Sequence, residues 1–343
     1  MTDLAEHACI TKTGAVILGN NVACDAFDAD TPLRVVTHAH ADHLGGLRKS
    51  IKCCEKVIMT PATRELAQIV NPTFKLGNSN VLPLEYDKPL KYKEETITLL
   101  KANHIMGAAQ VLVETVDDLR VVYTGDFKLE ETPVIDCDTL VIEATYGSPS
   151  FKRKFDVDIN ELLVSMIERR LRGGTVYVFG FYGKLQEIMQ MLRKADVEVP
   201  FVMPDTVHEI SKICDNYGMN LGSLTLDTSK EGQELLNKDL PCIAFYHTNT
   251  RFKVGLNHTR ICVSGWEFQN PCKQIGEQEY LVALSDHSDF DNLIEYVKRS
   301  KAKQVITDNY RSSHGKILAD EITKRTGIPA VTQPLRKGQT TLL

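Results

Sequence analysis

Short apolar runs separated by turn residues dominate the first 147 residues of the chain. Runs of this kind, rich in valine, isoleucine, leucine and threonine and bounded by glycine, asparagine or proline, are typical of strands. The predicted strands cover residues 9–10, 15–18, 22–24, 34–37, 57–60, 81–84, 96–100, 110–115, 120–124 and 140–142. One helix is predicted to begin near Leu44 and Leu47. Another is predicted from Pro61 to residue 70, because proline suits the first turn of a helix.

Longer amphipathic segments alternate with strands between residues 148 and 265. Helices are predicted over residues 157–171, 185–194 and 207–217, and strands over 175–179, 200–203, 242–246 and 260–264. This alternation favours βαβ units on a parallel sheet, so we expect an inserted domain here. The pattern then predicts a strand from residue 280, a helix over 292–299, a strand over 304–307 and a helix over 317–326. The sequence therefore predicts an α/β fold in three segments, 1–147, 148–265 and 266–343.

A histidine-rich segment follows the predicted strand 34–37. It contains His38, His40, Asp42 and His43 and ends at a pair of glycines. Imidazoles and a carboxylate at this density suit a divalent metal bound through nitrogen and oxygen. His38 and His40 are two positions apart, so in an extended chain their side chains point the same way. Asp42 and His43 are adjacent, so across a turn they can face two sides of one cavity, and two neighbouring ions could share the segment.

Further candidate ligands stand where other predicted strands end. His104, Asp126 and Glu143 each occupy such a position. As an isolated residue, His104 would more often be structural, but the preceding motif favours a ligand. A carboxylate such as that of Asp126 can bridge two metals through its oxygens. Asp25 has two interpretations: it orients a ligand histidine, or it is a plain turn aspartate. The repeated pattern predicts a site along one edge of a β-sandwich with helices outside.

Polar residues also precede the helix predicted over 292–299. His287 lies near the free backbone N–H groups of the helix start, where an anion would bind well, and Ser288 or Asp289 would cap the helix. After the strand 304–307 come Asp308, Asn309 and, five residues further on, His314.

Composition and charge limit the classes of protein that fit. The chain of 343 residues is 43% hydrophobic and 25% charged, which is typical of a globular protein. Its formal net charge of −5 gives no bulk support for a nucleic-acid partner, although a local basic stripe remains open. The residues of that stripe are Arg153, Lys154, Arg169, Arg170 and Arg172.

No apolar run reaches the roughly 18 residues of a membrane span, so we expect no membrane partner. The nine scattered cysteines and the absence of a targeting pattern at the start favour reduced thiols in a cytoplasmic protein.

The metal motif and the order of the later motifs resemble a known family. Residues 38–43 match the H-x-H-x-D-H signature of the metallo-β-lactamase superfamily. The segments 24–28, 123–127, 143–147 and 284–288 resemble its β-CASP branch, which includes nucleases acting on DNA and on RNA. The chain is most similar to Artemis-type DNA nucleases and to prokaryotic DNA-ligase-associated exonucleases, which are often labelled mRNA 3′-end processing factors. The resemblance covers nearly the whole chain and implies an αββα sandwich with an inserted β-CASP domain.

The resemblance also implies roles for individual residues. It assigns His38, His40 and His104 to one metal, Asp42 and His43 to a second, and Asp126 to a bridge between them. It implies one or two Zn²⁺ ions, with Mn²⁺ as an alternative. Glu143 matches the acidic motif that opens the β-CASP insert, and His287 matches the histidine that follows the insert. RNA-directed members carry a further histidine, and DNA-directed members an apolar residue, where this chain has Asp308 and Asn309. The choice between DNA and RNA therefore stays open.

These expectations combine into metal-dependent phosphodiester hydrolysis on a nucleic-acid substrate, with DNA favoured over RNA. The first expectation is a 5′-to-3′ DNA exonuclease in DNA repair, and the alternative is a β-CASP ribonuclease in RNA processing or decay. A lactonase- or thioesterase-like hydrolase and a catalytically silent scaffold fit less well. The expected roles are water positioning for Asp42, proton donation for His287, and phosphate contacts for Ser285, Ser288 and Lys184. A solvated lysine at a helix start is the other interpretation of Lys184, and Phe181, Tyr182 and Trp266 are candidates for base stacking by position.

Overall fold

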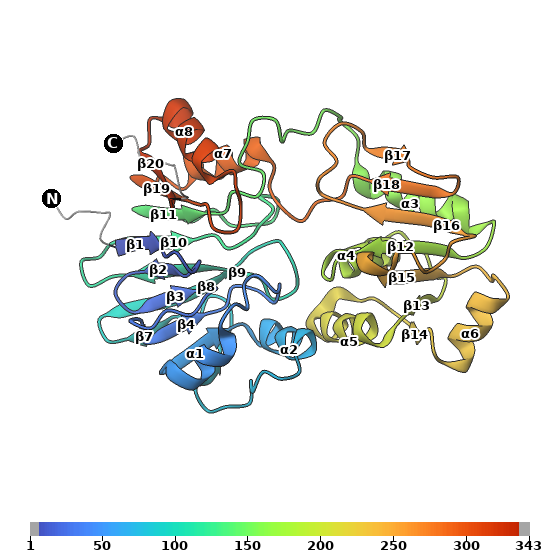
Figure 1. The fold of residues 1–343 in the computed structure, drawn as a ribbon, viewed down its shortest axis with the longest axis horizontal. Helices are drawn as coiled ribbons and strands as arrows, with labels where there is room; N and C mark the ends of the chain where they lie inside the picture. The colour runs from blue at the N-terminus through green and yellow to red at the C-terminus, as the bar shows by residue number, and fades with distance from the viewer. Residues whose placement is uncertain (1–6, 336–343) are drawn as a thin grey trace. The chain divides into compact units, whose positions relative to one another are not determined.

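Three β-sheets organise residues 7–335, the part of the chain that this computed structural model describes (Figure 1). The chain forms two units. Of the described residues, unit 1 contains 7–152 and 287–335, and unit 2 contains Arg153–Asp286. Two of the sheets belong to unit 1 and the third belongs to unit 2. The mixture of sheets and helices confirms the predicted α/β class.

The first sheet of unit 1 has six strands in chain order, antiparallel from β1 to β3 and parallel from β3 to β6. Its strands are β1 Ala8–Ile10, β2 Val16–Leu18, β3 Val22–Cys24, β4 Leu33–Val35, β5 Lys56–Met59 and β6 Val81–Pro83. The helices inserted between these strands are α1 Leu47–Cys53 and α2 Pro61–Val70. The predicted helix start at Pro61 is confirmed, and the side chain of Thr60 accepts a hydrogen bond from the Thr63 backbone N–H as its N-cap.

The second sheet of unit 1 has seven strands in the order β20-β19-β11-β10-β9-β8-β7. Its strands are β7 Leu90–Tyr92, β8 Glu95–Lys101, β9 Ala109–Glu114, β10 Arg120–Tyr123, β11 Thr139–Ile142, β19 Gln304–Asp308 and β20 Ala330–Gln333. Pairs from β7 to β10 are antiparallel, and pairs from β10 through β11 and β19 to β20 are parallel. Helices α7 Phe290–Arg299 and α8 Gly315–Thr326 lie beside the parallel part (Figure 1).

Side chains that point alternately to the two faces of the second sheet form two cores, one on each face. Val121 and Tyr123 of β10 join a cluster with residues of the first sheet, such as Leu33 and Val35. Val122, between them in the chain, joins a second cluster that includes helix residues such as Phe290, Leu293 and Leu318. Successive side chains of a strand point to opposite faces, so a sheet covered on both sides needs a continuous apolar run. The loops at the strand ends are therefore fixed by apolar packing on both faces.

The sheet of unit 2 has the order β14-β13-β15-β12-β16-β18-β17, and all its pairs are parallel except that of β17 with β18. Its strands are β12 Val176–Gly180, β13 Phe201–Met203, β14 Leu224–Leu226, β15 Ile243–His247, β16 Thr259–Val263, β17 Cys272–Gln274 and β18 Glu279–Val282. Its helices are α3 Ile159–Leu171, α4 Lys184–Lys194, α5 Asp205–Cys214 and α6 Lys230–Asn237, with a π-helical turn at Asp215–Met219 and a 3₁₀ turn at Thr248–Thr250.

The differences from the predicted elements have local causes. The helix predicted to end at residue 217 leaves α-helical geometry after Cys214, since Gly218 has a positive φ of 93°. The sequence pattern does not predict β14, which is only three residues long, or α6, which contains Gly232. None of the helices within residues 7–335 combines the length and apolarity needed to cross a bilayer.

Leu140→Ala tests the packing on the helix-covered face of β11. Leu140 is fully buried in the cluster formed with α7 and α8, so we expect the substitution to lower the free energy of unfolding by about 2–5 kcal/mol. Urea unfolding followed by circular dichroism measures the loss. Val116→Ala is the control, because Val116 is exposed and should change stability by less than about 0.5 kcal/mol. Equal effects of the two substitutions would contradict the two-core arrangement.

Candidate metal centre

Loops from both sheets of unit 1 bring the predicted ligands together. His38, His40 and His43 follow β4 of the first sheet, whereas His104 and Asp126 follow β8 and β10 of the second. Gly125, with φ of 56°, precedes Asp126, and a Cβ atom there would lie 3.0 Å from the Ala109 carbonyl oxygen and 3.2 Å from Thr37. A glycine at position 125 therefore allows the two loops to approach closely.

Four side chains point ligand atoms at one small volume. The candidate atoms of His38, His40, His104 and Asp126 lie within 4.8 Å of one another. Nδ1 of His40 is 3.1 Å from Nε2 of His38 and 3.1 Å from Nε2 of His104. Oδ2 of Asp126 lies 3.7 Å from Nε2 of His38 and 3.8 Å from Nε2 of His104.

This arrangement fits a divalent cation better than a hydrogen-bond network. A ring nitrogen either donates one proton or accepts through one lone pair, so Nδ1 of His40 cannot fully satisfy two neighbouring imidazoles. Three imidazole nitrogens and one carboxylate oxygen are, by contrast, a common donor set for zinc and related metals. The residues present therefore fit a metal ion.

A second group of donors shares the Asp126 carboxylate. Nε2 of His43 lies 3.3 Å from Oδ2 of Asp126 and 3.5 Å from Oδ2 of Asp42. This Nε2 is buried and has no hydrogen-bond partner among the described residues, whereas the Asp42 side chain is 65% exposed. An unpartnered buried nitrogen between two carboxylates is also suited to hold a cation.

The charges of this second group compensate one another. Burial lowers the pKa of His43, but the carboxylates of Asp126 and Asp25 outweigh burial and raise it to about 10. Burial acts to raise the pKa of Asp126, but the nearby charge of His43 holds it well below its usual value. Burial, and then His43, lower the pKa of His38 well below the usual value for histidine.

Asp25 orients the loop of residues 38–46, which we call the metal loop. Its Oδ2 lies 2.7 Å from Nδ1 of His43 and accepts a hydrogen bond from the Thr37 hydroxyl, and its Oδ1 accepts one from the Thr37 N–H. The contact fixes which ring nitrogen of His43 faces Asp126. Of the two interpretations of Asp25, the structure therefore shows the orienting contact.

Glu143 and His287 form a second pair beside the metal ligands. Both carboxylate oxygens of Glu143 lie near Nδ1 of His287, at 3.1 and 3.0 Å, and Oε1 also accepts the Phe127 N–H. The rings of His287 and His104 have centroids 4.8 Å apart. The backbone N–H of Ser288 donates to the Phe127 carbonyl, and its buried hydroxyl has no partner among residues 7–335.

Arg34 is a positioning residue that the sequence analysis does not identify. It is fully buried in β4, and its guanidinium donates to the backbone carbonyls of His43 and Gly45, at 2.9 and 3.2 Å. It also approaches the Ser50 hydroxyl at 3.5 Å and donates to the Val35 carbonyl. Burial lowers its pKa to about 10, although Asp25 acts in the opposite direction, so it stays charged at neutral pH. A charged residue inside an apolar strand is the one signal that could have revealed it.

Hydrogen bonds and an ion pair that involve none of the candidate metal ligands hold the loop after β19. Asp308 accepts hydrogen bonds from the backbone N–H groups of Tyr310 and Arg311 and pairs with the Arg311 guanidinium at 2.8 Å. Asn309 donates to the Pro334 carbonyl, and Nδ1 of His314 lies 3.1 Å from the Ser312 hydroxyl and 3.2 Å from the Thr145 carbonyl. Asp308 and His314 belong to none of the possible metal groups found among the described residues.

Lys184 and Ser285 belong to unit 2. Nζ of Lys184 lies 3.0 Å from Oδ1 of Asp286, and both side chains are 7% exposed. The interpretation of Lys184 as a solvated lysine at a helix start is therefore wrong, because the ion pair is buried. Of the predicted basic stripe, Arg170 stacks on Tyr280 and Arg153 on Phe268, with distances of 4.8 and 5.3 Å to the ring centroids.

Comparison with known proteins gives several relatives. No protein-family model matches the chain. The chain is 37% identical over 138 residues to an "uncharacterized protein in lig 3′region" of Acidianus ambivalens, an alignment that covers 40% of this chain and 99% of that protein. It is 21% identical over 292 residues to a probable DNA ligase of Opitutus terrae, covering 79% of this chain and 26% of the relative. It is 28% identical over 237 residues to RNase aCSPSF2 of Saccharolobus solfataricus, covering 58% and 48%.

The chain thus spans nearly all of the Acidianus protein but less than half of the other two relatives. Among solved structures, it is similar to a protein of unknown function from Enterococcus faecalis V583, with a TM-score of 0.57 and 12% identity over 91% of this chain and 82% of that one. At this identity the likeness concerns the fold alone.

Arg34→Met should weaken metal binding by releasing the loop that carries His43. Loss of such a supporting contact typically lowers metal affinity by about 10–100-fold. Competition for zinc against a chromophoric chelator measures the affinity. Lys52→Met is the matched control, because it removes an exposed charge from the last turn of α1, the helix that follows the same loop.

Circular dichroism melts of both variants separate loop release from unfolding. Arg34→Lys keeps the positive charge but loses the planar set of guanidinium N–H donors. Its zinc affinity should therefore lie between those of the wild-type protein and Arg34→Met. Unchanged zinc affinity in a folded Arg34→Met protein would contradict the positioning role.

Proposed function

Because the chain belongs to the β-CASP branch of the metallo-β-lactamase superfamily, we propose that it is a metal-dependent nuclease that hydrolyses phosphodiester bonds. One observation carries the proposal. Three histidines converge on one Asp126 oxygen, with the Glu143–His287 pair beside them. A group of this kind can hold a cation and present a proton donor next to it.

The proposed architecture is an αββα sandwich interrupted by a β-CASP domain. In support, the two sheets of unit 1 share a core, α7 and α8 pack on the outer face of one of them, and the chain leaves unit 1 after Lys152 and returns at His287. The division into residues 1–147, 148–265 and 266–343 stays part of the proposal.

Residues of both donor groups are proposed to hold the metal. His38, His40 and His104 would hold one ion, Asp42 and His43 would serve a second, and Asp126 would contribute to both. Zinc is the proposed metal, with Mn²⁺ as the alternative, since both accept nitrogen and oxygen donors. When bound, such an ion lowers the pKa of water and neutralises charge on phosphate oxygens.

The protein side chains then bind, orient and transfer protons. The exposed Asp42 carboxylate orients the attacking water by accepting a hydrogen bond from it. Glu143 holds Nδ1 of His287, and a carboxylate beside an imidazole stabilises the protonated form, so the ring can donate a proton to the leaving oxygen. The unpartnered hydroxyl of Ser288 can donate to a phosphate oxygen. Ser285 and Lys184 are proposed as further phosphate contacts.

A 5′-to-3′ DNA exonuclease in DNA repair is the proposed specific activity. The relative named as a DNA ligase aligns over 79% of this chain, whereas RNase aCSPSF2 aligns over 58%. The relative with 37% identity is named for its position in a lig 3′ region. A ribonuclease in RNA processing or decay is the second candidate, because relatives with RNA-directed names are more numerous.

Metal dependence and substrate choice are tested in one assay. Single-stranded DNA and RNA of one sequence, labelled at either end, are incubated with metal-free protein and with added Zn²⁺ or Mn²⁺. We expect cleavage only with metal, faster on DNA, and beginning at the 5′ end. Asp126→Asn should lose at least about 100-fold in rate because it removes the shared anionic donor, whereas the exposed Asp136→Asn serves as the control.

Absence of nucleotide release with either metal would overturn the nuclease proposal. Faster cleavage of RNA would instead favour the second candidate.

His287→Ala should lower kcat by about 10²- to 10⁴-fold, the usual contribution of a positioned proton donor. The metal content, measured by mass spectrometry, should stay at the wild-type value, because His38, His40, His104 and Asp126 remain. Glu143→Gln should give a smaller loss, since it keeps a hydrogen bond to Nδ1 of His287 without the negative charge. A drop in metal content matching the drop in kcat would show that His287 acts as a ligand instead.

A further inference from the structure

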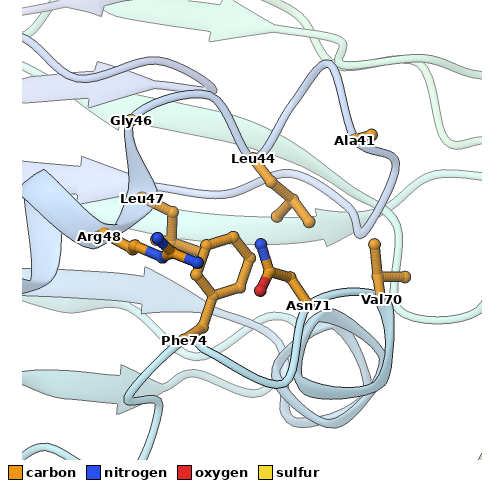
Figure 2. A pocket seen from close by; sticks show the side chains of 8 residues that line it. All are labelled: Ala41, Leu44, Gly46, Leu47, Arg48, Val70, Asn71 and Phe74. Carbon is orange, nitrogen blue, oxygen red and sulfur yellow. The ribbon is translucent and has the colours of Figure 1, made fainter.

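A cavity of about 370 Å³ lies in unit 1 on one side of the metal loop (Figure 2). It is enclosed by the loop itself, the start of α1 and the segment that follows α2. Pockets for small organic groups are typically about 300–1,000 Å³ and combine apolar walls with a few fixed polar groups. The size of the cavity therefore suits part of an organic ligand.

The walls are apolar and the rim is polar. Leu44, Leu47 and Phe74 are buried and contribute hydrocarbon and ring surface. Arg48 and Asn71 stand at the rim, and Figure 2 shows the Phe74 ring between them. A flat group with apolar faces and a polar edge matches these walls.

A hydrogen-bond network fixes the direction of the Asn71 carboxamide. Its Oδ1 accepts hydrogen bonds from the backbone N–H and the hydroxyl of Thr73, and that hydroxyl also accepts a hydrogen bond from the Arg48 guanidinium. The oxygen is thereby occupied, so the NH₂ group is the side of the amide that faces the cavity. In Figure 2 this nitrogen points towards Leu44. The cavity thus presents one oriented donor and one nearby cation.

The cavity and the candidate metal ligands share a loop. Ala41 lines the cavity and lies in the chain between His40 and Asp42, and Leu44 directly follows His43. Two residues that line the cavity are therefore direct neighbours in the chain of candidate metal ligands. A substrate whose phosphate reaches the metal could place a neighbouring part of the same molecule in the cavity.

We propose that this cavity receives a nucleobase of the nucleic-acid substrate, an inference that rests on the proposed function. The base lies against Leu44 and Phe74, the NH₂ group of Asn71 donates to an acceptor on the base edge, and Arg48 attracts an adjacent phosphate. A base has apolar faces, edge acceptors and a phosphate nearby, which together use every feature of the cavity. A free phosphate would leave the apolar walls without a partner, and a purely apolar group would leave Asn71 without one.

Asn71→Asp is the central test, because it keeps the shape and the acceptor for Thr73 but replaces the donor with a charged acceptor. Metal-free protein is mixed with a single-stranded oligonucleotide that carries fluorescent 2-aminopurine at either end, so binding is measured without cleavage. We expect quenching of the probe by the wild-type protein and at least about tenfold weaker binding by the variant. Asn78→Asp, at an exposed position on the same segment, is the control for added charge.

A second comparison removes the base instead of the side chain. With metal present, kcat/KM is measured on oligonucleotides with a normal or an abasic terminal nucleotide. The ratio of wild-type to Asn71→Asp values should fall towards one on the abasic substrate, because the lost contact involves the base. The same ratio on both substrates, or equal binding of base-containing and abasic ends by the wild-type protein, would overturn the base pocket.

Hydrolysis of bis(4-nitrophenyl) phosphate, which has no base, separates this proposal from the previous one. If the wild-type protein cleaves this compound and oligonucleotides, but Asn71→Asp matches Asn78→Asp in binding and in kcat/KM, the pocket proposal fails alone. If the wild-type protein cleaves neither, the proposed function fails. The binding arm then still decides whether the cavity accepts a base.

Discussion

Two buried and opposite charges hold the loop on which the site depends. Asp25 binds His43 and Thr37 from one direction, and Arg34 binds the carbonyls of His43 and Gly45. Burying an ion costs of the order of several kcal/mol unless it is paired and hydrogen-bonded, so both groups stabilise only the one loop conformation that satisfies them. Both contact His43, one at its ring and the other at its backbone. His43 therefore has little freedom, and its Nε2 stays directed at Asp126.

Sheet packing places the remaining donors around that loop. The strands before His104, Asp126 and Glu143 are β8, β10 and β11, which all belong to the second sheet. Side chains of β8, β9 and β10 reach the first sheet through the shared core. The strand before His38 belongs to the first sheet. Apolar contacts fix the two sheets against each other. The positions of their strand ends, and of the donors that follow them, are therefore fixed as well. The site is in this sense a consequence of the two-sheet core.

The sequence identified features that depend on residue type and missed those that depend on backbone partners. Apolar runs predicted most strands of unit 1, and the family resemblance is confirmed by the relatives. Arg34 was missed because its main partners are carbonyl oxygens, which every residue has. The Asn71 donor was missed because its direction is set by Thr73 and Arg48, contacts that exist only in the folded loop. In unit 2, the three-residue strand β14 left no periodic signal.

The net charge of −5 constrains how a polyanion could approach this protein. Long-range attraction to a nucleic acid normally comes from an excess of basic residues, which this chain lacks overall. The proposed function therefore requires attraction that is local. Metal ions would offset the negative charge of the region where Asp25, Asp42 and Asp126 gather, and Arg48 adds a cation on the helix that follows the same loop. Arg153 and Arg170 instead stack on aromatic rings, which limits their availability to phosphates. Bound metal would then add to the affinity that Arg48 and the base pocket supply without it, so binding would strengthen with metal occupancy and catalysis would require it.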